Sequence, residues 1–370
     1  MSLGLFHLVV EHGDAPLFGI IDPSAGILPN KANPVQVLPM TLPATMTAIV
    51  ATAPGGPDVL EPASLPLPVT APGEVLIRVA AAGVNYPDIA QRRGDYPPPP
   101  GHSPRIGLEV AGEIALAAGP WREGDKVAAL ANGGGYAEYV AVPAGQVLPV
   151  PPGWPLADAA ALPETWFTIT QTLVMRAGLA SGMSVLITGA AGGLGGAAVQ
   201  IARILGARPI AIVGAADKAD YARALGATAV IRHDIEDIVA RTRELTGGRG
   251  ADRVLDMLGG DATARHIDAS APFGHIVQVA TLGDRTAAVP LNKLMAKQLT
   301  LSGSTLRPQS TETKAAIAAH LRQHIWPALA DPAFPRPKIR RFALARAADA
   351  HRALEERSHY GKIVLLPGGE

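Results

Sequence analysis

The glycine-rich run Gly189–Gly196 contains the residues of this sequence whose types and spacing best fit a chemical task. An apolar stretch that predicts a strand, Val185–Thr188, precedes the run, and a stretch that predicts a helix follows it. Glycines in such a turn let the backbone approach a pyrophosphate, and the first N–H groups of the helix bind that anion. A tight turn without a ligand is the alternative, but the strand–turn–helix context favours a dinucleotide. The spacing is Ala-x-Gly-x-x-Gly, and the residues predicted to bind the dinucleotide are Ala190, Gly192, Gly193, Leu194 and Gly195.

The end of the next predicted strand, Pro209–Val213, distinguishes between the two nicotinamide dinucleotides. NAD sites place a carboxylate there to accept the ribose hydroxyls, whereas this strand runs into residues 214–216 without an acid. Lys218 follows closely and Arg232 ends the third strand, so two cations can meet a 2′-phosphate. Each cation alone is more often a solvated surface charge, and Asp217 is a candidate helix N-cap. The missing acid and the two cations together predict NADPH as the cofactor.

Composition excludes several other chemistries. The 370 residues include no cysteine, which removes disulfides, thiolate zinc sites and cysteine nucleophiles. Lys and Arg total 32, as do Asp and Glu, so no excess of positive charge points to nucleic acid or an anionic membrane. The first ten residues lack a basic segment and a cleavage pattern, and no apolar run reaches the ~18 to 20 residues of a membrane span. We therefore expect a cytoplasmic protein whose partner is a small molecule, with no nucleic acid and no membrane.

The elements that position the glycine-rich run fall into two patterns. Short strand-like stretches separated by glycine and proline fill residues 46–150 and predict a compact β-rich barrel. After residue 157 apolar strands alternate with helices, beginning with a helix over Asp158–Thr172, which predicts an α/β fold with a doubly wound parallel sheet. Residues 1–45, rich in proline, are expected to be an irregular extension, and Met46 is an alternative start. The strands of the alternating part are Val185–Thr188, Pro209–Val213, Ala229–Ile231, Arg253–Asp256 and His275–Val279, with helices beginning near Leu194, Lys218, Ile235 and Asp261.

Several segments resemble the medium-chain dehydrogenase/reductase superfamily, in its zinc-free quinone oxidoreductase (zeta-crystallin-like) branch. They are Met46–Val50 with Gly55–Pro57, Ala82–Asn85 with Asp88, Gly107–Gly112 and Gly361–Val364, and the resemblance covers Met46 to Leu366. Arg92–Gly101 and Ser302–Arg307 resemble the subgroup typified by the tumour-suppressor-inducible quinone oxidoreductase. The resemblance implies a GroES-like catalytic domain over residues 46–166 and 304–370, and a Rossmann NADPH-binding domain over residues 167–303.

The resemblance also implies roles for individual residues. Zinc-dependent relatives carry a cysteine and a histidine where this chain has Val84-Asn85 and Leu108, so no catalytic metal is expected. Asn85 is placed near the nicotinamide ribose, and Thr168 lies on a helix that faces the cofactor. The chain departs from the family at Arg232-His233, which replaces an Asn-Tyr pair near the adenosine phosphate. Further cofactor contacts are expected from two strand ends and from the closing strand, at Met257, Thr281, Leu282 and Lys362.

An acceptor of two electrons also needs a proton, and two tyrosines lie near the predicted site in sequence. Tyr96, which matches the subgroup pattern, and Tyr86 are candidate donors to a developing oxyanion, and the alternative is that both only wall the pocket. The leading hypothesis is an NADPH:quinone reductase. Reduction of an activated C=C bond in an enal or enone uses the same cofactor geometry, and a non-catalytic NADPH-binding protein is the alternative of another class. By resemblance we expect a homodimer that forms by edge pairing near Leu299–Gly303.

Overall fold

A computed structural model describes residues 42–356 and 359–369 of the chain. The predicted extension over residues 1–45 therefore lies almost wholly outside the described residues. From Leu42 onward the chain forms one compact unit that contains a parallel sheet and an antiparallel sheet.

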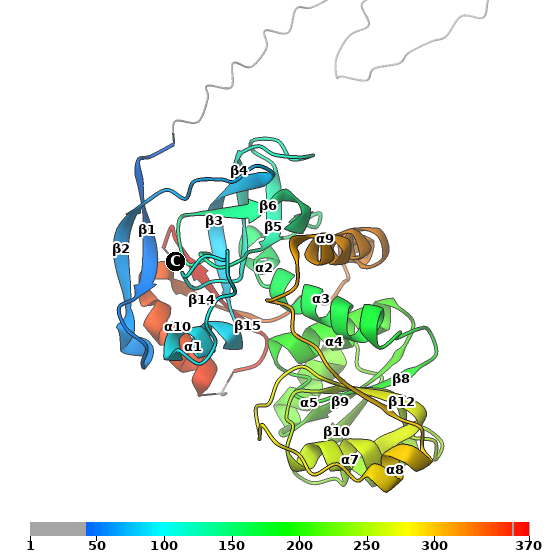
Figure 1. The fold of residues 1–370 in the computed structure, drawn as a ribbon. Helices are drawn as coiled ribbons and strands as arrows, with labels where there is room; N and C mark the ends of the chain where they lie inside the picture. The colour runs from blue at the N-terminus through cyan, green and yellow to red at the C-terminus, as the bar shows by residue number, and fades with distance from the viewer. Residues whose placement is uncertain (1–41, 357–358, 370) are drawn as a thin grey trace, which may run out of the picture. The chain divides into compact units, whose positions relative to one another are not determined.

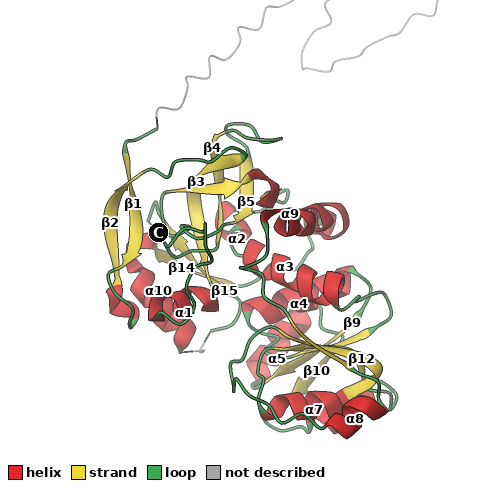
Figure 2. Cartoon of the chain, viewed as in Figure 1, coloured by secondary structure: helices red, strands yellow, loops and turns green. Residues whose placement is uncertain are grey.

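The parallel sheet carries the glycine-rich run (Figures 1 and 2). Its order in the described chain is β10 (Ala229–Arg232), β9 (Arg208–Val213), β8 (Ser184–Ile187), β11 (Ala251–Asp256), β12 (Ser270–Gln278) and β13 (Thr300–Gly303). The connecting helices are α4 (Gly193–Ile204), α5 (Ala216–Leu225), α6 (Ile238–Leu245), α7 (Asp261–Ala269) and α8 (Leu291–Ala296). In Figure 1, α4 and α5 lie on one face of the sheet, and α7 and α8 lie on the other. Because helices cover both faces, β8 is buried throughout and its sequence is continuously apolar after Ser184.

The order of the strands reverses between β8 and β11. The chain runs outward from β8 to β9 and β10, and then returns to β11 on the other side of β8. In doubly wound sheets, ligands bind at the carboxyl ends of the strands at this switch point. The predicted doubly wound sheet is confirmed, and it places the glycine-rich run at that point.

The antiparallel sheet provides the second set of elements. Its order is β14 (Ile339–Ala343), β15 (Lys362–Leu366), β3 (Glu74–Val84), β4 (Glu109–Leu116), β5 (Lys126–Leu130) and β7 (Val147–Pro149), with β6 (Tyr139–Pro143) paired to β3. The β14–β15 pair is parallel, and the other pairs are antiparallel. A separate hairpin joins β1 (Thr45–Ala51) to β2 (Leu60–Pro66). The helices outside the parallel sheet are α1 (Tyr86–Arg93), α2 (Leu156–Ala159), α3 (Pro163–Ile169), α9 (Thr311–His320) and α10 (Ala347–Glu355).

Several predicted elements differ from the structure. The predicted helix over Asp158–Thr172 is wrong as a single element, because α2 ends at Ala159 and α3 begins at Pro163. Pro163 lacks a backbone N–H, so it cannot continue the hydrogen bonds of α2, and it fits the first turn of α3. A π-helical turn over Thr170–Arg176 then continues α3. Strands β2 and β14 and helix α8 were not predicted. The domain boundaries at residues 166/167 and 303/304 stay predictions.

Candidate active site

The glycine-rich turn between β8 and α4 is shaped for close approach of the backbone. A Cβ added at Gly195 would lie 2.3 Å from the carbonyl oxygen of Gly189 and 2.7 Å from Cα of Ala190, so only glycine fits. At Gly192 the nearest atom to an added Cβ, the carbonyl oxygen of Gly189, is 3.4 Å away, which leaves that position open. Helix α4 begins at Gly193, and the N–H groups of its first turn have no acceptor within the helix. An open surface above unpaired donors fits a dinucleotide pyrophosphate.

The closing strand β15 lies directly against this turn. The Gly361 N–H donates to the carbonyl oxygen of Ala191 at 2.9 Å, and Gly361 forms a parallel bridge with Gly192. The methylene chain of Lys362 covers Gly193, since an added Cβ there would lie 2.5 Å from Cδ of Lys362. The structure thus brings Lys362 to the predicted pyrophosphate turn, although 169 residues separate Lys362 from Gly193 (362 − 193).

Lys362 joins the turn to a buried polar cluster of Asn85, Glu109 and Lys362. The Lys362 ammonium donates to Oδ1 of Asn85 and to Oε1 of Glu109, both at 2.5 Å. The Asn85 amide also donates to Oε1 of Glu109, at 2.8 Å. Glu109 is fully buried and Lys362 is only 5% exposed, so the pair is shielded from water. Asn85, predicted as a catalytic residue near the nicotinamide ribose, and Lys362, predicted to bind the cofactor, are therefore in direct contact.

Local sequence explains the position of Asn85. Strand β3 ends at Val84 and α1 begins at Tyr86, so Asn85 lies at the N-cap with extended backbone. Asp88, at the third helical position, accepts the Asn85 N–H at 2.8 Å. This contact leaves the Asn85 side chain available for Glu109 and Lys362.

A chain of buried hydrogen bonds continues from Asp88 toward α10. The Tyr136 hydroxyl donates to Oδ2 of Asp88 at 3.2 Å. Arg92 donates to Nδ1 of His351 at 3.2 Å, which assigns the His351 proton to Nε2, from which it donates to the Tyr136 oxygen at 3.0 Å. Arg92 also pairs with Glu355 at 2.8 Å. This series of hydrogen bonds links the N-cap of α1 to the partly exposed carboxylate of Glu355 on α10.

The pKa values of Asp88 and His351 in this hydrogen-bond series follow from their burial. Burial raises the pKa of Asp88 to about 7, against hydrogen bonds from the Asn85 N–H and the Tyr136 hydroxyl that lower it. Burial and the nearby Arg92 guanidinium lower the pKa of His351 to about 3. His351 is therefore neutral, and Asp88 changes charge near neutral pH.

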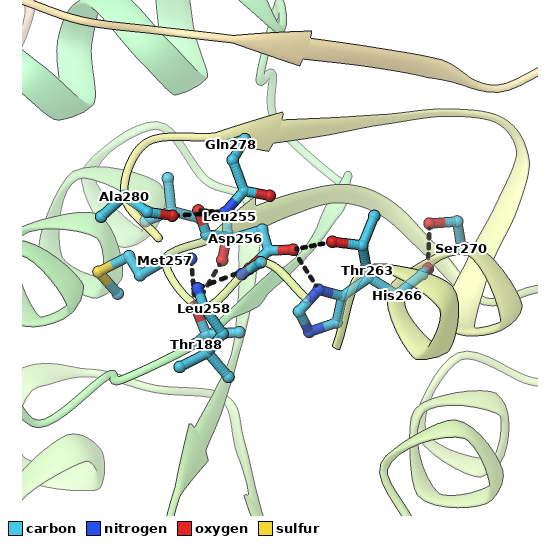
Figure 3. Close-up of polar contacts among 11 residues, drawn as sticks. Thr188, Leu255, Asp256, Met257, Leu258, Thr263, His266, Ser270, Gln278 and Ala280 are labelled. Atoms are coloured by element: carbon cyan, nitrogen blue, oxygen red, sulfur yellow. Dashed lines mark hydrogen bonds and ion pairs between the residues drawn. The ribbon is translucent and has the colours of Figure 1, made fainter. Parts of the chain in front are cut away.

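The carboxyl end of β11 is held by the Asp256 side chain (Figure 3). The carboxylate accepts the N–H groups of Leu258 at 2.8 Å and Gly259 at 3.1 Å, and the Nδ1–H of His266 at 2.8 Å. Burial raises the pKa of Asp256, but the contacts with His266 and the N–H groups of Gly259 and Leu258 together outweigh burial and hold that pKa below its usual value. Asp256 thereby fixes the loop that begins at Met257.

The loop after β11 carries predicted cofactor residues to the glycine-rich turn. The Met257 N–H donates to the Thr188 hydroxyl at 2.9 Å, across the switch point (Figure 3). The methyl group of Met257 lies 3.3 Å from where a Cβ on Gly189 would stand. Leu282 donates its N–H to the carbonyl oxygen of Met257 at 3.0 Å, and Thr281 lies beside Gly259, with its methyl group 3.5 Å from an added Cβ there. Met257, Thr281 and Leu282 therefore lie together at the carboxyl edge of the sheet, and their contact with a cofactor stays a prediction.

Three basic side chains, those of Lys218, Arg232 and His233, lie in the region where the 2′-phosphate of NADPH is predicted to bind. Lys218 lies in the first turn of α5, which begins at Ala216 after the N-cap Ala215, so the N-cap alternative for Asp217 is wrong. Arg232 is engaged by Asp234 through two hydrogen bonds of 2.9 and 2.5 Å. Sequence reasoning gave no role to His233, yet its Nε2 lies 2.8 Å from where a Cβ on Gly214 would stand. Gly214 follows β9, so an imidazole covers the strand tip at which phosphate recognition was predicted.

The two predicted tyrosines lie in different surroundings. The Tyr86 hydroxyl contacts the carbonyl oxygen of Leu354 at the end of α10, at 3.4 Å. Tyr96 lies under the guanidinium of Arg307, which is 5.3 Å from the ring centroid. Burial raises the pKa of Tyr96, while Arg307 lowers it and Glu164 adds to the rise. Tyr96 therefore belongs to the surroundings of Glu164 and Arg307, whereas the Tyr86 hydroxyl is held by α10.

Sequence reasoning missed three charged residues here: Glu164 and Arg307, which face Tyr96, and Lys314, which contacts Arg307. Arg307 and Lys314 are buried, and Lys314 donates to Oδ1 of Asn132 at 2.8 Å and to the carbonyl oxygen of Arg307 at 3.0 Å. The Nε of Arg307 is buried and has no hydrogen-bond partner among residues 42–356 and 359–369. Burial lowers the pKa of Lys314 to about 8. A proline before Glu164 was a visible helix-start signal, but the burial of these charges depends on distant segments.

Two cavities lie near these residues. One of about 10 Å³, lined by Gly192, Gly193, Lys362 and residues of α3, lies behind the glycine-rich turn and has the volume of a single water. Another of about 500 Å³ is lined by Val50–Pro54, Gln91, Pro97, Pro98 and Ile106. No predicted cofactor residue lines the larger cavity, so we do not place the hydride acceptor there.

Metal and membrane signatures can be checked over residues 42–356 and 359–369. In these ranges no three His, Asp or Glu side chains stand close enough together to hold a metal ion. None of the helices there has the length and apolar character that crossing a membrane requires.

Comparisons with known proteins match both halves of the chain. Residues 71–152 match the family described as "Alcohol dehydrogenase GroES-like domain", and residues 193–321 match the family described as "Zinc-binding dehydrogenase". The chain is 34% identical over 326 residues to the quinone oxidoreductase of Pseudomonas aeruginosa, covering 85% of this chain and 97% of that protein. It is 29% identical over 319 residues to human quinone oxidoreductase, covering 84% and 95%. The crystal structure of Escherichia coli quinone oxidoreductase complexed with NADPH matches with a TM-score of 0.74 at 28% identity, covering 87% and 100%.

Proposed function

The chain belongs to the medium-chain dehydrogenase/reductase superfamily and is an NAD(P)H-dependent oxidoreductase, and we propose that it reduces quinones with NADPH. The observation that carries the proposal is the contact of Lys362 with both Gly193 and Asn85, which connects the pyrophosphate turn to the residue expected at the nicotinamide ribose. The quinone oxidoreductase relatives favour a quinone as the acceptor. Membership of the tumour-suppressor-inducible subgroup stays a prediction from Arg92–Gly101.

The residues that would hold NADPH follow the carboxyl edge of the parallel sheet. The first turn of α4 would bind the pyrophosphate, and Lys218, Arg232 and His233 would meet the 2′-phosphate. Asn85, Thr168 and Met257 would meet the nicotinamide half. When bound, NADPH supplies the hydride.

We expect the electron acceptor to lie at the residues around Tyr96, which we call the acceptor end. This region contains two buried basic side chains and is partly closed to water. Arg307 is buried over the ring of Tyr96, Lys314 is buried against the carbonyl of Arg307, and the Nε of Arg307 has no hydrogen-bond partner among the described residues. Preorganised donors of this kind stabilise negative charge that develops on a quinone or enone oxygen. These residues therefore support an acceptor that becomes an oxyanion when it is reduced.

Steady-state oxidation of NADPH tests the proposal. We expect turnover with a benzoquinone or naphthoquinone that is at least tenfold faster, in kcat/KM, than with an alkenal. Preference for the alkenal would establish the C=C reductase instead. NADPH binding by fluorescence without turnover of either acceptor would establish a non-catalytic NADPH-binding protein.

We also propose a homodimer formed through β13, an edge strand of the described parallel sheet opposite β10. Its Leu301 is 37% exposed, and an open edge offers unpaired N–H and carbonyl groups to a second copy. Light scattering should give the mass of two chains, and Leu301→Pro should reduce it to that of one. A cytoplasmic location stays a prediction from the sequence.

A further inference from the structure

We propose that Glu164 is the acid that gives the reduced acceptor its proton. This inference rests on the proposed reductase function and adds a catalytic residue to it. Glu164 lies in the first turn of α3, the helix that also carries Thr168.

Helix α3 presents Glu164 and Thr168 on one side. Pro163, Thr165, Trp166, Phe167 and Ile169 are all buried, whereas Glu164 and Thr168 are partly exposed. Residues four apart lie on the same helix face. Thr168 is expected to face the cofactor, so Glu164 lies on the cofactor side of α3.

The backbone of Glu164 is fixed to the polar cluster beside the glycine-rich turn. Its N–H donates to Oε2 of Glu109 at 2.9 Å, while Oε1 of the same carboxylate holds Asn85 and Lys362. The Thr168 hydroxyl donates to the carbonyl oxygen of Glu164 at 2.7 Å. By contrast, neither carboxyl oxygen of Glu164 forms a hydrogen bond or an ion pair with any described residue. Glu164 is therefore held in place through its backbone, while its side-chain carboxyl is available to an acceptor.

The charged and titratable groups that face Glu164 come from six segments. The carboxylates of Glu109 on β4 and Asp88 on α1 disfavour ionisation, and Lys362 on β15 and Lys314 on α9 favour it. Tyr96 and Arg307 face it from the loops after α1 and β13. Burial and the two carboxylates raise the pKa of Glu164 to about 8, so the group carries a proton at neutral pH.

Other groups near the acceptor end suit the role less well. A general acid works best when its pKa lies near the operating pH. Burial moves the pKa of Tyr96 upward from an already high value, which makes it a weaker donor. The Lys314 ammonium already donates to Asn132 and Arg307. Glu164 alone of these three combines an unengaged group with a pKa near neutrality.

The step balances for a quinone as follows. The acceptor gains a hydride, which carries two electrons, from the reduced nicotinamide, and one oxygen becomes an oxyanion. The O–H bond of the Glu164 carboxyl then breaks, and an O–H bond forms on that oxygen. Water returns a proton to the carboxylate after the hydroquinone leaves, so one proton is consumed for each NADPH oxidised.

The test compares Glu164→Gln with the wild-type enzyme. Gln keeps the shape but cannot supply a proton, and Glu244→Gln, on the exposed surface of α6, is the matched control. The single-turnover rate of NADPH oxidation by a benzoquinone should fall about 100-fold in Glu164→Gln and remain unchanged in the control. In the wild type this rate should decline as pH rises through about 8, and in Glu164→Gln that decline should be absent. Glu164→Asp should restore part of the rate.

Two further readouts separate catalysis from folding and from the proposed function. Infrared spectroscopy at pH 7 should show a protonated carboxylic acid band that Glu164→Gln loses, and NADPH affinity should change less than twofold. An unchanged rate and pH profile in Glu164→Gln would overturn the role of Glu164 while leaving the reductase intact. Loss of NADPH binding in that variant would assign Glu164 a structural role and also overturn it. A wild-type enzyme that binds NADPH but reduces no quinone would overturn the proposed function itself, and this inference with it.

Discussion

Replacing Lys362 with Met removes the one basic side chain of the Asn85–Glu109–Lys362 cluster. Met preserves much of the methylene chain that covers Gly193, so the glycine-rich turn keeps its packing. The change leaves Glu109, which is fully buried, with hydrogen bonds only from Asn85 and the Glu164 N–H. The variant therefore tests the buried charge pair rather than the packing.

The magnitude follows from the burial of both partners. Removing one member of a buried ion pair strands the other charge in a medium of low dielectric constant, which costs about 3–5 kcal/mol. The two remaining hydrogen bonds solvate Glu109 in part, so we expect a loss of about 3 kcal/mol in the free energy of unfolding. Adding Glu109→Gln to Lys362→Met removes the stranded charge and should recover at least half of that loss.

Urea unfolding followed by circular dichroism measures these differences. Lys126→Met, an exposed lysine at the start of β5, is the matched control and should change stability by less than about 0.5 kcal/mol. A Lys362→Met variant within 1 kcal/mol of the wild type would refute the reasoning. So would a double variant less stable than Lys362→Met, because the destabilisation would then not come from the Glu109 charge.

Three further predictions follow from the site. Lys218→Ala should weaken NADPH binding about tenfold and leave NADH binding unchanged, as measured by fluorescence titration; equal losses would exclude a 2′-phosphate contact. Gly195→Ala should abolish NADPH binding, because its Cβ would lie 2.3 Å from the carbonyl oxygen of Gly189. Gly192→Ala, where that distance is 3.4 Å, should leave the unfolding midpoint within 2 °C of the wild type, and a larger drop would contradict the open geometry. The raised pKa of Asp88, about 7 against 3.8 when unfolded, means that the native state binds the extra proton between these values. Stability should therefore fall as pH rises from about 4 to about 7, by up to about 1.4 kcal/mol for each pKa unit, and Asp88→Asn should flatten that fall in urea titrations at several pH values.

The parallel sheet and the glycine-rich turn could be predicted because their signals are local. An apolar strand, a glycine run and a helix follow one another within Val185–Ile204, and each residue type matches the backbone that it forms. Helix α6 shows that a helix predicted from local signals can begin a few residues away from the predicted start. We predicted a start near Ile235, and the helix begins at Ile238, where Asp237 caps it by accepting the Ala240 N–H.

The charged part of the site could not be predicted, because its chemistry depends on contacts between distant segments. Glu164 had no predicted role from the sequence, and the residue lay inside the single helix predicted over Asp158–Thr172. The rise in its pKa comes first from burial and then from Glu109 and Asp88, which lie 55 and 76 residues away (164 − 109 and 164 − 88). The pairing of Arg232 could not be predicted either, although its partner is close in sequence. Asp234 lies only two residues later, but its contact with the Arg232 side chain depends on the folded backbone.

The balance of charge explains why protonated carboxylic acids belong in this site. Asp88, Glu109 and Glu164 lie around the ammonium of Lys362, and a bound pyrophosphate would add negative charge at the other end of the lysine chain. Ionising all three acids would leave an excess of buried negative charge, which is costly at low dielectric constant. A protonated Glu164 beside the Glu109–Lys362 ion pair gives the cluster less negative charge than an ionised Glu164 would. A dinucleotide phosphate near Lys362 would further favour the protonated form of Glu164. Cofactor binding would therefore help to protonate the acid that donates to the reduced acceptor.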